Sequence, residues 1–313
     1  MNPFPSTYSI VFMGTPQIAA TVLEALLEEG YPIKALIASP DKEVGRKRIL
    51  TPVPTKVVAE KYGIPVFQPV KIRNDYGFLS ELKPDLILTM AYGQIVPQEV
   101  LDIPKQGCLN LHGSLLPKLR GAAPIQRAII SGEKTTGVTL MEMVAAMDAG
   151  KMYASIDVDI EEDDNYSSLC EKISKAAIDL TLDSLPLYQK GLLAGVSQNE
   201  DDVTFADKIR PENEKLDLNL GKHAFCDYVR GLSFTPGAYL LLGESKFKIL
   251  KAKPVNDEVN DEVGTLRFGK KGVTLQLCDG LVSLLLVQPA GKKEMDGAAF
   301  ANGYRFLEGR KLV

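Results

Sequence analysis

An asparagine and a histidine lie two positions apart in a short apolar run, Cys108–His112. If that run is a β-strand, the Asn110 amide and the His112 imidazole point to the same face of the sheet, because strand side chains alternate. Both groups can donate hydrogen bonds to a carbonyl oxygen that becomes negative during acyl transfer. The pair therefore predicts an acyl-transfer site. The alternative, a structural histidine at a strand end, stays open.

The carboxylate that could complete this site is Asp148, in the sequence Met147–Gly150. It could fix the orientation of the His112 ring or relay a proton during catalysis. An aspartate shortly before a glycine is also common in an ordinary turn, so this alternative stays open. A serine nucleophile is disfavoured, because Ser114 follows Gly113 in a loop without the G-x-S-x-G sequence of a nucleophile elbow.

A basic cluster, Arg46, Lys47 and Arg48, lies in a long loop between Pro40 and Pro54. The loop follows an apolar run that we expect to be a strand of the sheet. Its cations could bind phosphate groups of a nucleic acid. A solvated surface loop is the alternative interpretation.

Metal and dinucleotide sites find little support in the sequence. The four cysteines lie more than fifty residues apart and form no C-x-x-C pair, and the chain has two histidines, so we expect no metal. The first turn, Gly14-Thr15-Pro16, lacks the G-x-G-x-x-G sequence that lets bare backbone approach a pyrophosphate. A nicotinamide-dependent dehydrogenase is therefore disfavoured.

The first half of the chain alternates apolar runs with amphipathic segments. This alternation is typical of an α/β fold with a mainly parallel, Rossmann-like sheet covered on both faces. Such sheets bind ligands at the carboxyl ends of their strands, where Asn110 and His112 lie. We expect strands near residues 9–13, 33–39, 65–67, 85–90, 108–112 and 136–143. We expect helices near 17–29, 56–62, 75–82, 123–131 and 166–185, the last ended or kinked by Pro186.

The pattern of apolar residues changes in the last third of the chain. Five short apolar runs separated by turns follow a helix near residues 222–230, and they predict a small C-terminal β-barrel of OB-like type. A polar, glycine-containing segment precedes them. We therefore divide the chain into a Rossmann-like catalytic domain (residues 1–189), a linker (190–206) and a C-terminal barrel domain (207–313).

The net charge of −4 argues weakly against a nucleic-acid partner, but the charge is unevenly distributed. Residues 207–313 carry a net +3 and the remainder a net −7. The C-terminal third could therefore meet phosphate groups, although three extra charges could also be scatter. No apolar stretch approaches the roughly 20 residues needed to cross a bilayer, and residues 1–7 lack the basic start of a secretory signal. We expect a cytoplasmic protein without a membrane partner.

Together these segments resemble the methionyl-tRNA formyltransferase family over nearly the whole chain. The most specific match is Asn110–Pro117, which continues through Arg120–Gln126. Three stretches depart from the family's usual residues, namely Leu119, Val144–Ala146 and Lys151. Further matching motifs are Phe12–Pro16, Gly45–Pro52, Pro65–Pro69, Ala91–Gln94, Pro236–Tyr239 and Gly291–Lys293.

The resemblance implies formyl transfer from 10-formyltetrahydrofolate to the amino group of initiator methionyl-tRNA. It implies that Asn110, His112 and Asp148 are catalytic and that the C-terminal barrel helps to hold the tRNA. Folate contacts are expected from Ser114, Leu115, Leu116 and Pro117, and tRNA contacts from Arg46, Lys47, Arg48 and Lys208. We expect the chain to act as a monomer.

Other functions stay open at this point. A related enzyme could formylate a small amine, such as an amino sugar or a glycinamide, although a glycinamide enzyme normally lacks the second domain. A formylfolate hydrolase would use water in place of the amine. A nucleic-acid-binding protein with an inactive sheet domain is the alternative from a different class, and the intact set of Asn110, His112 and Asp148 argues against it.

Overall fold

The computed structural model of the chain describes residues 4–45, 47–256, 261–269 and 272–313. These residues fall into two units, each with its own hydrophobic core. The first unit contains the residues up to Pro124 together with Thr135–Asp159 and Cys170–Ala206, and the second contains Ile125–Lys134, Ile160–Leu169 and Asp207–Val313. The segments around His112 and Asp148 both belong to the first unit.

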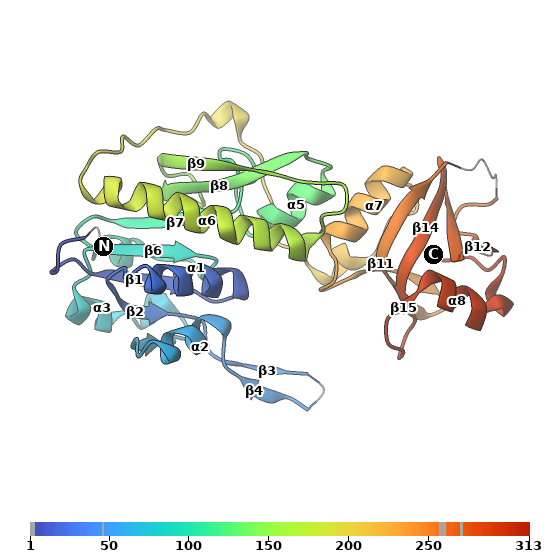
Figure 1. The fold of residues 1–313 in the computed structure, drawn as a ribbon, viewed down its shortest axis with the longest axis horizontal. Coiled ribbons are helices and arrows are strands. Elements are labelled where there is room, and N and C mark those ends of the chain that lie inside the picture. The colour runs from blue at the N-terminus through green and yellow to red at the C-terminus, as the bar shows by residue number, and fades with distance from the viewer. Residues whose placement is uncertain (1–3, 46, 257–260, 270–271) are drawn as a thin grey trace. The chain divides into compact units, whose positions relative to one another are not determined.

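A seven-stranded sheet forms the centre of the first unit (Figure 1). Its order is β5 (Val66–Phe67), β2 (Ile33–Ile37), β1 (Ile10–Gly14), β6 (Leu86–Met90), β7 (Cys108–His112), β8 (Thr135–Glu142) and β9 (Met152–Asp159). Strands β5 to β7 of this order run parallel, whereas β8 pairs antiparallel with both β7 and β9. Every residue of β1 and β6 is buried, as the apolar runs predicted. The mainly parallel, Rossmann-like sheet is confirmed.

Both faces of this sheet are covered. The helices of the first half are α1 (Gln17–Glu28), α2 (Pro54–Lys61), α3 (Gly77–Leu82), α4 (Gln98–Leu101) and α5 (Pro124–Ile130), followed by α6 (Tyr166–Gln189). Val11 and Met13 of β1 point into a core cluster that also contains Leu79 of α3 and Val100 of α4. Phe12 points to the opposite face, because strand side chains alternate, and it is also fully buried. In Figure 1, α1 and α6 lie in front of the sheet.

We expected Pro186 to end or kink the last of these helices; α6 does not end there and continues to Gln189. The proline removes the N–H group that would bond to the Leu182 carbonyl one turn earlier. The Tyr31 hydroxyl donates to that carbonyl at 3.5 Å, and Leu185 is fully buried. Packing therefore sustains the last turn of α6 despite the missing backbone hydrogen bond.

The predicted basic loop of residues 40–54 contains a two-stranded hairpin that we did not expect. Its strands are β3 (Lys42–Val44) and β4 (Ile49–Thr51), and the hairpin projects from the first unit in Figure 1. The side chains of both strands are exposed. The hairpin therefore depends on its base for its placement.

That base is organised around Asp41, which immediately precedes β3. The Asp41 carboxylate accepts hydrogen bonds from Lys56 Nζ at 2.6 Å and from Gln68 Nε2 at 2.8 Å. It also accepts from the Val53 backbone N–H at 3.4 Å, which lies just beyond β4. The hydrogen bond from Lys56 is the largest contribution to a lowered pKa of the Asp41 carboxyl group. One carboxylate thus ties both ends of the hairpin to α2.

The second unit is an antiparallel sheet accompanied by the helices α7 (Lys222–Gly231) and α8 (Gly297–Gly303). Its order is β10 (Ala238–Leu242), β11 (Ser245–Val255), β14 (Gly280–Gln288), β13 (Gly272–Leu277) and β12 (Leu266–Gly269), and β15 (Met295–Asp296) pairs with β14. The C-terminus joins the two ends of this sheet. Leu241 of β10 and Val313 exchange backbone hydrogen bonds at 2.7 and 3.0 Å, and Leu312 N donates to the Gly264 carbonyl near β12 at 2.9 Å. The small C-terminal β-barrel is therefore confirmed.

Candidate active site

Asn110 and His112 lie at the carboxyl end of β7, near the middle of the first unit's sheet. His112 is buried, with 5% of its surface exposed, and its ring contacts the Leu119 carbonyl oxygen through Nε2 at 2.9 Å. A carbonyl only accepts, so this ring nitrogen donates. Asn110 is half-buried, and its side-chain amide has no hydrogen-bond partner in the part of the chain that the structure describes. The amide is therefore available to a ligand.

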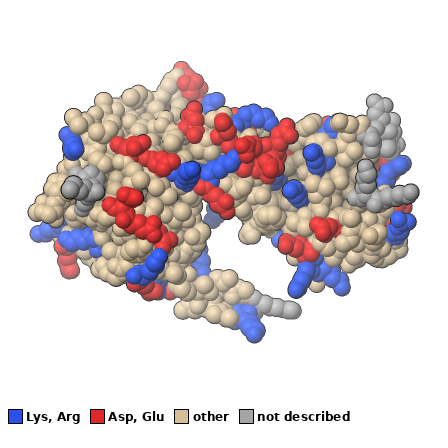
Figure 2. Space-filling view, in the orientation of Figure 1, with Lys and Arg blue, Asp and Glu red and all other residues tan. Residues whose placement is uncertain are grey.

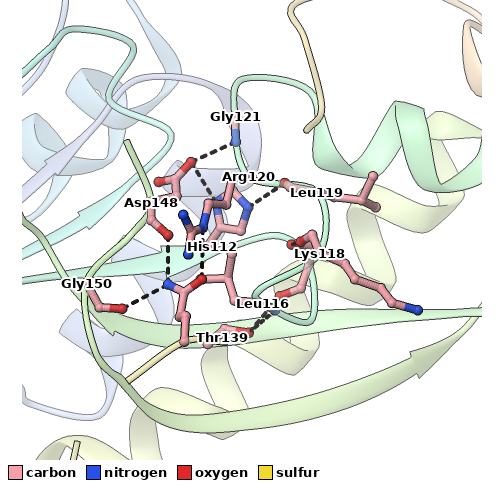
Figure 3. A network of polar contacts seen from close by, with 11 residues as sticks. His112, Leu116, Lys118, Leu119, Arg120, Gly121, Thr139, Asp148 and Gly150 are labelled. Carbon is pink, nitrogen blue, oxygen red and sulfur yellow. Dashed lines mark hydrogen bonds and ion pairs between the residues drawn. The ribbon is translucent and has the colours of Figure 1, made fainter. Parts of the chain in front are cut away.

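Asp148 lies in the loop between β8 and β9 and points toward His112 (Figure 3). Its Oδ2 atom is 3.6 Å from His112 Nδ1, which is an ion-pair distance longer than a hydrogen bond. The same oxygen accepts a hydrogen bond from the Gly121 backbone N–H at 2.8 Å. The backbone of Asp148 is left-handed, with φ at 49°, a conformation that aspartate adopts more readily than most residues. The structure thus brings the predicted imidazole and carboxylate together.

The segment expected to contact the folate directly follows β7. Ser114 is buried, and its hydroxyl donates to the backbone carbonyl four positions later at 2.7 Å. Thr139 of β8 donates to the Ser114 carbonyl at 2.7 Å and accepts from the Leu116 N–H at 3.1 Å. Leu115 and Pro117 are half-buried. Ser114 and Leu116 therefore shape the loop, while Leu115 and Pro117 keep surface that a ligand could contact.

The residues expected to contact tRNA are accessible where the structure describes them. Lys47 and Arg48 are exposed at the tip of the β3–β4 hairpin, and Figure 2 shows positive charge at its end. Arg48 forms an ion pair with Glu43 at 2.5 Å, with 81% of its side chain exposed, so the pair adds little stability. Lys208 is exposed in the second unit. Arg46 lies outside the described residues.

A glutamine and an arginine that we did not select also belong to this site. Gln198 Nε2 donates to the backbone carbonyls of Asp148 and Gly150, both at 2.8 Å. Arg120 is 5% exposed and donates from Nε to Gln198 Oε1 at 2.9 Å. Arg120 lies in one of the recognised motifs. Gln198 comes from the polar segment expected to be a linker, where neither spacing nor composition distinguishes it from other polar residues.

The Gly14–Thr15 turn at the end of β1, where a nicotinamide-dependent sheet would bind a dinucleotide, is hydrogen-bonded to neighbouring segments. Thr55 Oγ1 donates to the Gly14 carbonyl at 3.0 Å, and Thr15 Oγ1 donates to the Tyr92 carbonyl at 3.0 Å. A Cβ atom on Gly14 would lie 2.8 Å from the Met90 carbonyl oxygen. Gly14 therefore permits the close approach of β1 and β6.

The strand that carries Asn110 and His112 also contains a cysteine. Cys108 lies in β7, but burial raises the pKa of its thiol to about 12, so it is a poor nucleophile at neutral pH. Within the described ranges, no group of three or more His, Cys, Asp or Glu side chains is arranged to hold a metal ion. None of the helices described is both long and apolar enough to span a membrane.

Known proteins match this chain along nearly its whole length. Residues 8–185 match the family described as formyl transferase, and residues 208–305 match the formyl transferase C-terminal domain. The methionyl-tRNA formyltransferase of Bacillus pumilus (strain SAFR-032) is 45% identical over 307 residues, which cover 97% of each chain. The chain belongs to the methionyl-tRNA formyltransferase family. The family is one of folate-dependent formyltransferases, and the resemblance drawn from the motifs is confirmed.

A second family member, from Lactobacillus johnsonii, is 40% identical over 310 residues, covering 97% of this chain and 99% of the relative. Among solved structures, HypX from Aquifex aeolicus in complex with tetrahydrofolic acid matches with a TM-score of 0.66 and 19% identity, over 96% of this chain and 48% of that one. The N-formyltransferase from Helicobacter canadensis, in complex with folinic acid and dTDP-3-aminofucose, has a TM-score of 0.68 and 18% identity, over 90% of this chain and 100% of that one. At these identities the two structures share the fold alone with this chain.

Proposed function

We propose that this protein transfers the formyl group of 10-formyltetrahydrofolate to the amino group of methionine on initiator methionyl-tRNA, for translation initiation in the cytoplasm. The family supports this proposal, because relatives that are 40 and 45% identical over 97% of the chain are methionyl-tRNA formyltransferases. The observation that carries it is the 3.6 Å approach of Asp148 Oδ2 to His112 Nδ1. His112 lies on the strand that also presents Asn110, whose amide has no hydrogen-bond partner among the described residues.

In the proposed reaction the amine nitrogen bonds to the formyl carbon, and the bond from that carbon to N10 of the folate breaks. The carbonyl oxygen becomes an oxyanion before this second bond breaks. Asn110 donates a hydrogen bond to the oxyanion, and a donor of this kind contributes about 3–4 kcal/mol. The proton lost by the amine ends on N10, and tetrahydrofolate leaves.

His112 supplies the second donor in this mechanism. Its Nε2 donates to the Leu119 carbonyl in the structure, so the formyl oxygen takes the place of that carbonyl when the folate binds. Asp148 faces the other ring nitrogen and is itself held by the Gly121 N–H. Asp148 thereby orients the ring and helps to remove the amine proton, a role that contributes about 10²–10⁴-fold in rate.

The two substrates are assigned to different surfaces. In this proposal the catalytic domain (residues 1–189) carries out the chemistry, and the C-terminal domain (207–313) binds tRNA. The linker (190–206) connects the two domains. Since all three catalytic side chains come from one chain, we propose that it acts as a monomer. The proposed folate contacts are Ser114, Leu115, Leu116 and Pro117, and the proposed tRNA contacts are Arg46, Lys47, Arg48 and Lys208.

The test is tRNA-dependent formylation by Asn110→Ala, His112→Ala and Asp148→Ala, with circular dichroism to confirm folding. Each substitution should lower kcat/KM by about 10²–10³-fold, because each removes a group that acts only in the transition state. Lys118→Ala is the matched control, since Lys118 lies in the same loop with an exposed side chain. Near wild-type turnover in all three active-site variants would overturn the assignment.

The same assay separates the alternatives left open by the sequence. If formylfolate is consumed only when charged initiator tRNA is present, the amine acceptor is on the tRNA. Consumption with water alone identifies a hydrolase, and consumption with an amino sugar or a glycinamide identifies a small-amine enzyme. Salt-sensitive tRNA binding without any formyl release identifies a binding protein.

A further inference from the structure

Residues 196–206, here called the strap, lie beside two parts of the proposed active site. At one end, Val196 and Met152 of β9 exchange backbone hydrogen bonds at 2.8 and 2.9 Å. At the other end, the Thr204 carbonyl accepts from Arg120 N at 2.9 Å, and Ala206 N donates to the Arg120 carbonyl at 2.7 Å. The strap is therefore an ordered part of the first unit, attached on both sides of the catalytic loops.

In the middle of the strap, both the nitrogen and the oxygen of the Gln198 side-chain amide form hydrogen bonds. Its Nε2 donates to the carbonyls of Asp148 and Gly150, both at 2.8 Å. Its Oε1 accepts from Arg120 Nε at 2.9 Å. One side chain therefore links the loop that carries the Asp148 carboxylate to the loop that follows β7. Both carbonyls would lose this partner without Gln198.

Arg120 completes the link from the opposite side. Its guanidinium is almost fully buried, and it donates to both carboxylate oxygens of Glu200 in the strap, at 2.8 and 3.3 Å. This contact lowers the pKa of the Glu200 carboxyl group. A buried guanidinium requires partners of this kind, because removing its charge from water is costly. Arg120 and the strap thus depend on each other.

The loop around Asp148 needs such support. Asp148 adopts a left-handed backbone conformation, which aspartate tolerates better than most residues but less readily than glycine, so surrounding contacts must hold it. Its Oδ2 atom must face His112 Nδ1 and at the same time accept a hydrogen bond from the Gly121 N–H. Gly121 is the residue directly after Arg120. Figure 3 shows this arrangement of Asp148, His112, Arg120 and Gly121. The position of the carboxylate therefore depends on how the two loops are held together.

We propose that Gln198 and Arg120 are positioning residues that fix the Asp148 carboxylate against His112. They act through the backbone of Asp148 and the N–H of Gly121. The inference rests on the proposed catalytic role of Asp148. It also makes part of the segment between the two domains a component of the active site.

The kinetic test uses Gln198→Ala and Gln198→Glu in the full-length protein. The glutamate variant keeps the size and the acceptor for Arg120, but it places an oxygen against the two carbonyls. Both variants should lower kcat by about 10–100-fold, because small misplacement of a reacting group has effects of this size. KM values for tRNA and formylfolate should stay within about twofold of wild type. Asp201→Ala is the matched control, since the Asp201 side chain is exposed in the same strap and forms no hydrogen bond among the described residues.

A second measurement reports position without activity. Amide hydrogen exchange at Gly121 should accelerate at least about tenfold in Gln198→Ala and Arg120→Lys, because the Asp148 acceptor moves away. Unchanged exchange at Gly121 in both variants overturns the proposal, and so does a loss of kcat/KM that lies entirely in KM. Failure of the proposed function is recognised separately. In that case Asp148→Ala would keep wild-type turnover, while exchange at Gly121 would still accelerate in Gln198→Ala and Arg120→Lys.

Discussion

The loop around Asp148 and the β3–β4 hairpin both carry residues that the sequence singled out, yet they are built in opposite ways. The Asp148 carboxylate is held by the Gly121 N–H, and its backbone carbonyl is bonded to Gln198. On the hairpin, Arg48 is 81% exposed and has one surface ion pair. Chemistry on reacting atoms requires fixed geometry, whereas contact with phosphate requires accessible charge. We therefore expect changes in the first region to lower kcat and changes in the second to raise the KM for tRNA.

The largest effect is expected from Asp148→Asn. Asparagine keeps the size of the side chain and tolerates the same left-handed backbone, so this change removes the charge and replaces one carboxylate oxygen by an NH₂ group. We expect kcat to fall about 10²–10³-fold, with the KM for tRNA within about twofold of wild type. Steady-state kinetics with charged initiator tRNA measure both quantities. A variant whose main defect is weak tRNA binding would erase the contrast between the two regions.

On the hairpin we expect a smaller effect, which changes the KM for tRNA instead of kcat. Lys47→Ala and Arg48→Gly should each raise the KM for tRNA by about 3–10-fold. Each should also reduce the slope of the logarithm of the tRNA-binding constant against the logarithm of the salt concentration by about one. Glycine is chosen for Arg48 because its φ is 49°. The matched control is Lys61→Ala, a cation on α2 that pairs with Glu24. If kcat rather than KM changed, the hairpin would belong with the catalytic loop instead of with the docking surface.

The smallest effect is expected at the base of the hairpin. Hydrogen bonding from Lys56 lowers the folded-state pKa of Asp41. The contribution of the ionised Asp41 carboxylate to folding stability is therefore complete above the unfolded-state pKa of about 3.9. It is lost as the pH falls through the lower folded-state value. Asp41→Asn should therefore reduce the Tm by about 1–3 °C at pH 7 and by less at lower pH. Thermal melts across this range measure the difference, and Asp75→Asn, an exposed carboxylate, is the control. A Tm difference that grows on acidification would contradict the assignment.

Periodicity predicted the sheet well because its strands are apolar along their whole length, as β1 and β6 illustrate. The alternation of strand side chains also placed Asn110 and His112 on one face. The meeting of His112 with Asp148 came from the family resemblance, since spacing along the chain gives no information on which loops approach each other.

Other features could not be predicted because they depend on contacts between distant segments. The β3–β4 hairpin has three-residue strands with exposed side chains, so no apolar alternation marks it. Gln198 acquires its role only when the strap lies against the loop of Asp148. The helix α6 passes Pro186 because packing compensates for a local preference that would end it.

The convergence of the imidazole and the carboxylate on one reacting carbon is tested most directly by a double-mutant cycle on His112 and Asp148. His112→Ala and Asp148→Ala should each lower kcat/KM by about 10²–10³-fold, and the double variant should lose no more than about threefold beyond the worse single one, because the two groups act as a unit. Losses that multiply in the double variant would show that the two residues act independently and would contradict the proposed site.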